Sequence, residues 1–194
     1  MKIIILIVVY LISAKNLLAQ EMEPRNYASV PVGLNIGVMS YSYSDGNIVA
    51  DATSPIESLE LTTHSINLGY LRTFGLFGKL ARVQYSIPYI FMGGTAKING
   101  KDTSGTRSGL ADSRLKFGIN IFGSPALAPK DFQRFNEETV FGASVVLSIP
   151  TGQYYDDKMI NIGSHRWGIK PELGVSVKRG PFYLEFYSGV WFFT

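Results

Sequence analysis

The chain contains no cysteine, and only two of its 194 residues are histidines, His64 and His165. The absence of cysteine excludes disulfide bonds, thiolate nucleophiles and cysteine-ligated metal sites. The sequence also lacks a Gly-x-Ser-x-Gly nucleophile motif and a phosphate-binding loop with its lysine. Acidic residues occur at Asp102, Asp156 and Asp157, but their spacing does not match a calcium-binding loop. We therefore expect no enzymatic activity, no cofactor and no metal ion.

A strong charge of either sign is also missing. The sequence has 18 basic and 15 acidic residues, which gives a formal net charge of +3. Two of the basic residues, Lys2 and Lys15, belong to an N-terminal segment that we expect to be removed, and no basic run occurs elsewhere. A nucleic-acid-binding surface needs such a cluster of basic side chains. The composition therefore argues against nucleic acid as a partner.

The long apolar run of the chain lies at its N-terminus. Lys2 precedes the apolar residues 3–12, and Leu17, Leu18 and Ala19 then lead to a cleavage point after Ala19 or Gln20. This order is typical of a secretory signal peptide. The alternative is a membrane-spanning helix, which needs about 20 apolar residues, and polar residues interrupt this run too early. We expect residues 1–20 to be a signal peptide and residues 21–194 to form one exported domain.

The rest of the sequence alternates between apolar and polar residues, the pattern of a strand that shows a different environment to each face. In residues 107–122, Leu115, Phe117 and Ile119 alternate with polar or charged residues. No segment has a sustained helical period, and at most a short helical turn is expected near 130–135. We expect strands in these segments: 32–38, 66–74, 81–91, 107–122, 139–150, 167–178 and 182–193.

The clearest segments are roughly ten to twelve residues long, which matches transmembrane strands of about 9–11 residues better than soluble strands of about five or six. Short turns at 75–78 and 179–181 alternate with long polar connectors at 44–58, 93–108 and 151–166, as in outer-membrane barrels. The connector 123–138 is the exception. The pattern predicts an all-β fold, an antiparallel transmembrane β-barrel with about seven strands in this chain. A soluble periplasmic β-protein is the alternative.

Charged and polar residues follow one face of two predicted strands, and we expect them to face the lumen of the barrel. They are Asp112, Arg114, Lys116, Asn120, Lys170, Glu172 and Lys178. Their mixed charges would either orient a passing solute or form an ion-pair network that fills a narrow interior. The sequence leaves both interpretations open.

Several motifs stand out, at 107–112 leading into 123–127, at 150–154 and at 161–174, with a Pro-Val-Gly element at 31–33. Together they resemble the outer-membrane transporter family named for the meta-pathway of phenol degradation. The resemblance extends from about Pro24 to the last residue. It implies a β-barrel channel in the bacterial outer membrane that passes small aromatic or hydrophobic molecules. The partners would be outer-membrane lipid, the solute and the outer-membrane assembly machinery.

The chain departs from this family at its C-terminus. Family members usually continue for several strands beyond the Trp-Phe-Phe element at 191–193. Seven strands is also an odd number, whereas single-chain bacterial barrels have even numbers. We therefore expect the sequence to be C-terminally truncated, with a small closed barrel as the alternative. A non-transporting barrel with a structural or adhesive role is the alternative to a channel.

Overall fold

The computed structural model describes residues 25–48, 56–158 and 160–194, so the predicted signal peptide at 1–20 lies outside the described residues. Within those ranges no helix is long and apolar enough to cross a membrane. The helix α2 spans Pro129–Phe132 and overlaps the segment 130–135, where a short helical turn was expected. The strands are β1 Asn35–Ile48, β2 Ile56–Leu76, β3 Lys79–Ile98, β4 Lys101–Leu110, β5 Ser113–Phe122, β6 Thr139–Ile149, β7 Gly168–Arg179, β8 Phe182–Gly189 and β9 Phe192–Phe193.

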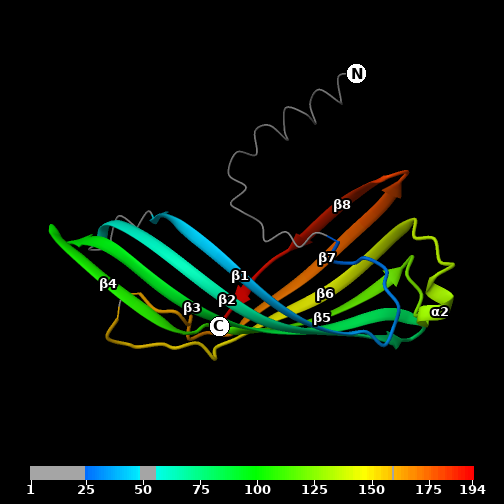
Figure 1. Cartoon of the computed structure of the whole chain (residues 1–194), viewed down its shortest axis with the longest axis horizontal. Helices are drawn as coiled ribbons and strands as arrows, with labels where there is room; N and C mark the ends of the chain where they lie inside the picture. Colours follow the sequence, from blue (N-terminus) through cyan, green and yellow to red (C-terminus); the bar gives the residue numbers. More distant parts are fainter. Residues whose placement is uncertain (1–24, 49–55, 159) are drawn as a thin grey trace, which may run out of the picture.

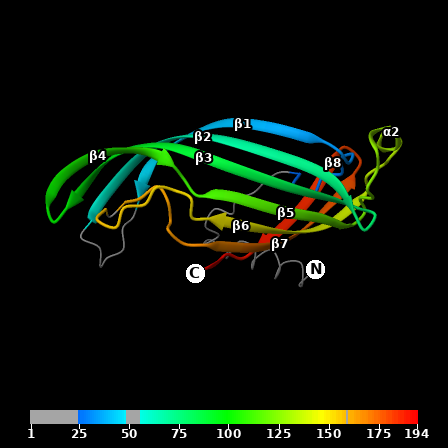
Figure 2. The same ribbon diagram turned by 90° about the horizontal axis from the view of Figure 1, so that it is seen from below.

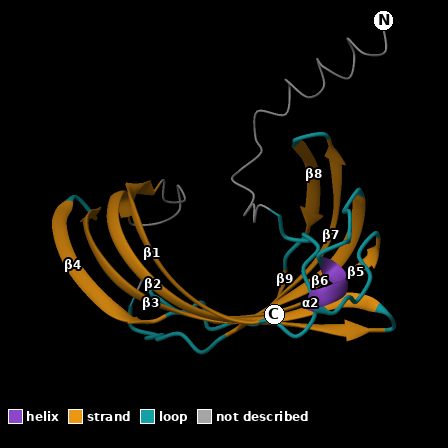
Figure 3. Ribbon diagram, turned by 45° about the vertical axis from the view of Figure 1, so that its right-hand side comes forward, coloured by secondary structure: helices purple, strands orange, loops and turns teal. Residues whose placement is uncertain are grey.

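The strands form one antiparallel sheet in the order β1-β2-β3-β5-β6-β7-β8, with β4 on β3 and β9 on β7. The sheet curls into a half-barrel, as Figure 3 shows. The prediction of an antiparallel all-β fold with about seven strands is confirmed. Among the described residues, the edge strands β1 and β8 each have a single neighbour in this order.

The short turns share one end of the sheet (Figure 1). The β2–β3 and β7–β8 turns lie at the same end as the β5–β6 connector with α2, and the β3–β4 hairpin lies at the other (Figures 1 and 2). At the short-turn end the connector folds back on the β2–β3 turn, because the Ala126 amide donates to the Gly78 carbonyl at 3.1 Å. The first strand begins at Asn35 rather than at Val32, whose amide donates to the Leu127 carbonyl instead.

The prediction of a long loop at 93–108 is wrong, because this segment forms most of a long hairpin. The strands β3 and β4 pair in register from Ile98 opposite Lys101 to Tyr89 opposite Leu110. Asn99 and Gly100 have φ angles of 49° and 76°. Positive φ at both central residues defines the turn that best matches the twist of a hairpin, and Asn-Gly is its preferred sequence. The Asn99-Gly100 pair therefore already indicated this hairpin in the sequence.

The expected strand 182–193 is interrupted after Gly189, and β9 resumes the same register at Phe192 opposite Ile169. The gap lies opposite Pro171, which has no N–H to donate to the ladder. The Val190 amide still donates to the Pro171 carbonyl, at 3.4 Å. The chain therefore continues along β7 through this gap.

Candidate functional site

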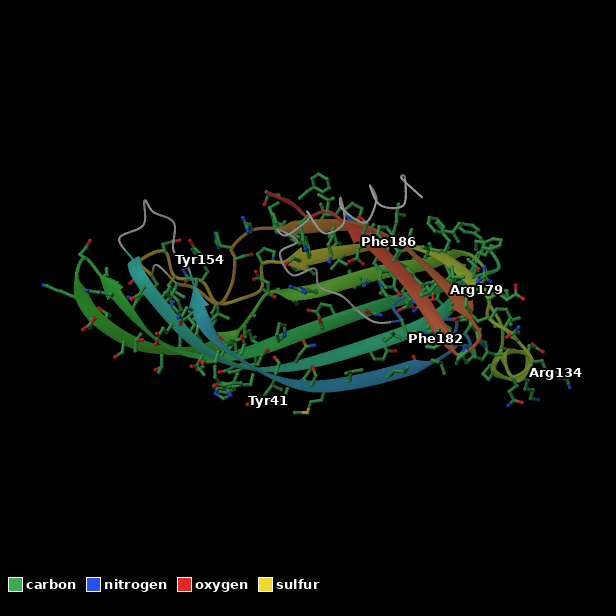
Figure 4. All side chains as sticks on the ribbon, turned by 90° about the horizontal axis from the view of Figure 1, so that it is seen from above. Tyr41, Arg134, Tyr154, Arg179, Phe182 and Phe186 are labelled. Atoms are coloured by element: carbon green, nitrogen blue, oxygen red, sulfur yellow. The ribbon has the colours of Figure 1, made fainter. Side chains whose placement is uncertain are left out.

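The two faces of the curled sheet differ in chemistry. The outer, convex face carries large apolar side chains that stay exposed, such as Leu68 (56% exposed) on β2 and Leu173 (53%) on β7. Figure 4 labels Phe182 and Phe186 of β8, which belong to the same exposed class. In a water-soluble protein, a second layer of helices or strands would cover such an apolar face.

The inner, concave face carries the polar residues, and strand register aligns them in rows. One row runs from Gln84 on β3 through Lys116 and Val146 to Lys170 on β7. The next row holds Arg82, Gly118, Ser144 and Glu172. Several of these polar side chains are buried although they belong to a one-layer sheet. The curl therefore brings the polar side chains of different strands together.

Glu172 is the centre of an ion-pair cluster on this face. Its Oε1 lies 2.8 Å from the Lys170 Nζ, and its Oε2 lies 3.0 Å from the Lys116 Nζ. The Ser144 hydroxyl donates to the same Oε2 at 2.8 Å. The lysine side chains are only 8% and 11% exposed. Because buried charges need opposite charges and hydrogen bonds, one carboxylate holds the two ammonium groups in place.

Aromatic rings flank the cluster around a hollow of about 740 Å³. The Lys170 Nζ lies 5.1 Å from the centre of the Trp191 ring, and the Arg114 guanidinium carbon lies 6.0 Å from it. Cations within about 6 Å of a ring face are attracted to its electrons. The hollow is lined by these groups together with Tyr27, Asn67, Gln84 and Tyr187. It presents both charge and aromatic surface to whatever enters it.

The remaining predicted residues lie apart from this cluster. The Asp112 carboxylate accepts from the Gly152 amide at 2.9 Å and from the Ser164 amide and hydroxyl at 2.8 and 2.6 Å. It therefore fastens the connector 150–167 to the end of β5. The Lys178 Nζ lies 5.9 Å from the Tyr183 ring, at the short-turn end of β7.

Asn120 is fully buried, and its side chain donates to the Tyr27 carbonyl at 3.0 Å. Tyr27 belongs to an N-terminal turn, residues 25–29, that no periodicity in the sequence reveals. The Tyr27 ring is 1% exposed, its hydroxyl lies 2.9 Å from the Ser144 hydroxyl, and its centre lies 5.8 Å from that of Tyr187. The turn therefore occupies the concave face beside the ion-pair cluster.

Arg82 holds the backbone of this turn. One guanidinium nitrogen donates to the Asn26 carbonyl at 2.6 Å, and another donates to the Ala28 carbonyl at 2.9 Å. The alternation in 81–91 places Arg82 on the polar face of its strand. That signal could have identified Arg82 as a residue of the concave face, but its partners are more than fifty positions away in the sequence.

Glu137, in the connector before β6, holds the turn from the other side. Its carboxylate accepts from the Arg25 guanidinium at 2.8 Å and from the Ser29 amide at 2.6 Å. Burial raises the pKa of Glu137, but the hydrogen bonds from Ser29 and Arg25 outweigh burial and hold this pKa below its ordinary value. Glu137 is therefore ionised at neutral pH and keeps the turn in place.

A cluster of metal-binding side chains does not occur in the described ranges.

Comparisons with known proteins agree with this architecture. No curated protein matches the chain. The structure is similar to an outer membrane channel from Pseudomonas putida F1, with a TM-score of 0.65 and 20% sequence identity. The similarity covers 90% of this chain and 61% of that one, so the chain spans less than two thirds of the channel's length. A family model described as "Putative MetA-pathway of phenol degradation" matches residues 40–185. The chain belongs to this family, as its sequence motifs predicted.

Proposed function

We propose that this chain forms part of the wall of a bacterial outer-membrane channel that passes small aromatic or hydrophobic molecules. The observation that carries the proposal is the two-faced sheet: exposed apolar side chains cover the convex face, and the ion-pair cluster of Lys116, Lys170 and Glu172 lies on the concave face. A transmembrane barrel needs an apolar surface toward lipid and a polar interior. The family and the similarity to a channel support the same function.

The polar residues of the concave face would line the lumen, and the rings around the hollow would contact the solute. Trp191 and Tyr187 offer flat apolar surface, while Lys170 and Arg114 offer charge beside it. Such a mixture suits a small aromatic molecule with one polar group. The chemistry is binding and passage, with no covalent step.

Export and assembly follow from the same proposal. Residues 1–20 would direct the chain across the inner membrane, and the outer-membrane assembly machinery and lipid would be its further partners. An open sheet edge in lipid leaves unsatisfied N–H and C=O groups that cost several kcal/mol each. Since β1 and β8 each have one neighbour among the described residues, we propose that further strands complete the barrel around this half.

A second candidate function is a non-transporting barrel with a structural or adhesive role. The observation that favours it is the turn 25–29, which fills part of the concave face. A soluble periplasmic β-protein is less compatible with the structure, because Leu68, Leu173 and Phe186 would all face water. Extraction that depends on detergent, together with gel mobility that changes on heating, would support a barrel, and free solubility would contradict both barrel functions.

The channel is tested by measuring current through planar bilayers that contain the purified protein in potassium chloride. An ion current establishes an open pore, and benzyl alcohol should interrupt it in a concentration-dependent way because it fits the ring-lined hollow. Glucose, a polar solute without a ring of π electrons, serves as the control and should not interrupt it. A protein that inserts but carries no current would support the non-transporting barrel. Equal interruption by both solutes would contradict the aromatic preference.

A further inference from the structure

The turn 25–29 is held by five strands of the half-barrel. Arg82 on β3 and Glu185 on β8 both bond to it, although β5, β6 and β7 separate these two strands in the sheet. Only the inner side of a curled sheet brings such distant strands to one segment. The side chains that reach the turn are, in strand order, Arg82, Asn120, Ser144, Ser176 and Glu185.

The backbone of the turn is satisfied by the protein rather than by solvent. Four consecutive carbonyl groups, those of residues 25–28, all accept hydrogen bonds. Their donors are, in order, the Ala28 amide, Arg82, Asn120 and Arg82 again. Arg82 is 6% exposed and Asn120 is fully buried. Burying a guanidinium is costly unless it is hydrogen-bonded, so these two side chains form a specific seat for the turn.

A notch in the sheet receives the Tyr27 ring. Gly142 on β6 and Gly174 on β7 are directly paired across the ladder, and both face the turn. A Cβ atom built on Gly142 would collide with the Tyr27 ring, and so would one built on Gly174. Glycine at both positions therefore leaves room for the ring at the wall. With a larger residue at either position, the ring would have to move toward the centre of the half-barrel.

We propose that the turn Arg25–Ser29 is the constriction of the pore and that Tyr27, whose buried ring anchors the turn to the wall, is its positioning residue; this inference rests on the proposed channel function. The turn lies at the short-turn end, where the Gly33 amide donates to the Thr73 carbonyl as the chain enters β1. Asn26 and Tyr27 also line the hollow beside the ion-pair cluster. A solute that crosses the hollow therefore meets the turn before it can leave at this end.

The docking of the turn is tested with the barrel-forming protein, and the 194 residues of this chain contain no cysteine that would compete for the label. Ser29 is 8% exposed, so Ser29→Cys should react slowly with a water-soluble maleimide in the folded barrel. Adding Gly142→Ala should displace the Tyr27 ring and raise the labelling rate several-fold. The control is Gly37→Ala on β1, where an added Cβ meets no atom within 4 Å. Rapid labelling of Ser29→Cys without a second change would contradict the docked turn.

The constriction is tested by single-channel current with the same variants without the cysteine. Tyr27→Ala removes the volume of the ring and should raise the conductance several-fold and weaken the interruption by benzyl alcohol. Gly142→Ala, which moves the ring toward the centre of the half-barrel, should lower the conductance, whereas Gly37→Ala should match the parent. If the parent conducts and both variants have the same conductance as the parent, the turn is not the constriction, although the channel function remains supported. If neither the parent nor any variant conducts, both the inference and the channel function are contradicted. Tyr27→Ala keeps the test decisive if Gly142→Ala fails to assemble.

Discussion

Glu172 contacts two lysines and a serine at once, so its removal should disturb the concave face more than any exposed charge. In Glu172→Gln the Lys116 and Lys170 ammonium groups would face each other without their shared carboxylate. Breaking a buried ion pair from one side costs about 3–5 kcal/mol. We expect Glu172→Gln to lower the free energy of unfolding in urea titrations of the refolded protein by a large part of this amount.

The matched control for this change is Asp157→Asn. Asp157 forms an ion pair with Lys158 at 2.5 Å, but the side chains are 69% and 49% exposed. Exposed ion pairs contribute little to stability, so this variant should unfold at the parent's urea concentration. Equal losses in the two variants would show that burial does not distinguish the two sites.

Glu137 makes the stability of the N-terminal turn depend on pH. Its folded-state pKa lies below the ordinary value, so its contribution is present above an unfolded pKa of about 4.3. The contribution is lost as the pH falls through the lower folded-state pKa. The melting temperature of Glu137→Gln should therefore lie below that of the parent at neutral pH. This difference should shrink in acid, and a difference independent of pH would contradict the ionised state of Glu137.

Residue partners were harder to predict than residue positions. Alternation alone placed Lys116, Lys170 and Glu172 on one face, and the register of the strands shows why they meet. The same pattern treats Asn120 and Ser144 as open positions on the polar face, whereas the structure buries both against the N-terminal turn. This burial depends on residues more than ninety positions apart, which no local pattern contains.

The position of the connector between β6 and β7 depends on the Asp112 carboxylate. Asp112 accepts three hydrogen bonds from Gly152 and Ser164, and hydrogen bonds to a charged group contribute about 1.5–3 kcal/mol. In Asp112→Asn the connector should loosen, and trypsin should cleave after the exposed Lys158 several times faster than in the parent. Asp156→Asn, in the same connector, is the control. Unchanged cleavage of Asp112→Asn would show that other contacts hold the connector.

The lengths of the elements were predicted less well than their existence. The hydrophobic alternation ends where both faces of a strand meet water, so it missed the distal part of β3 and all but the end of β4. Their pairing extends through Thr95 opposite Ser104 and Lys97 opposite Asp102, which are polar on both strands. The Asn99-Gly100 pair marked the hairpin turn, but polarity made the surrounding segment look like a loop.

The whole sheet could be predicted because alternation repeats in almost every strand and fixes which residues share a face. The curl and the docked turn could not, since both depend on contacts between strands that are distant in sequence. The turn joins β3 and β8 through Arg82 and Glu185. For the whole molecule, we propose that the convex face meets lipid and the concave face meets the pore.

The most direct test of this claim exchanges two neighbouring residues of β2 for arginine. Leu68 lies on the convex face, and Asn67 lines the hollow on the concave face. An arginine at the bilayer midplane of a barrel costs about 2–4 kcal/mol. In urea titrations of the protein folded into liposomes, Leu68→Arg should lose stability of this order, and Asn67→Arg should stay close to the parent. Equal losses, or a larger loss for Asn67→Arg, would contradict the assignment of the two faces.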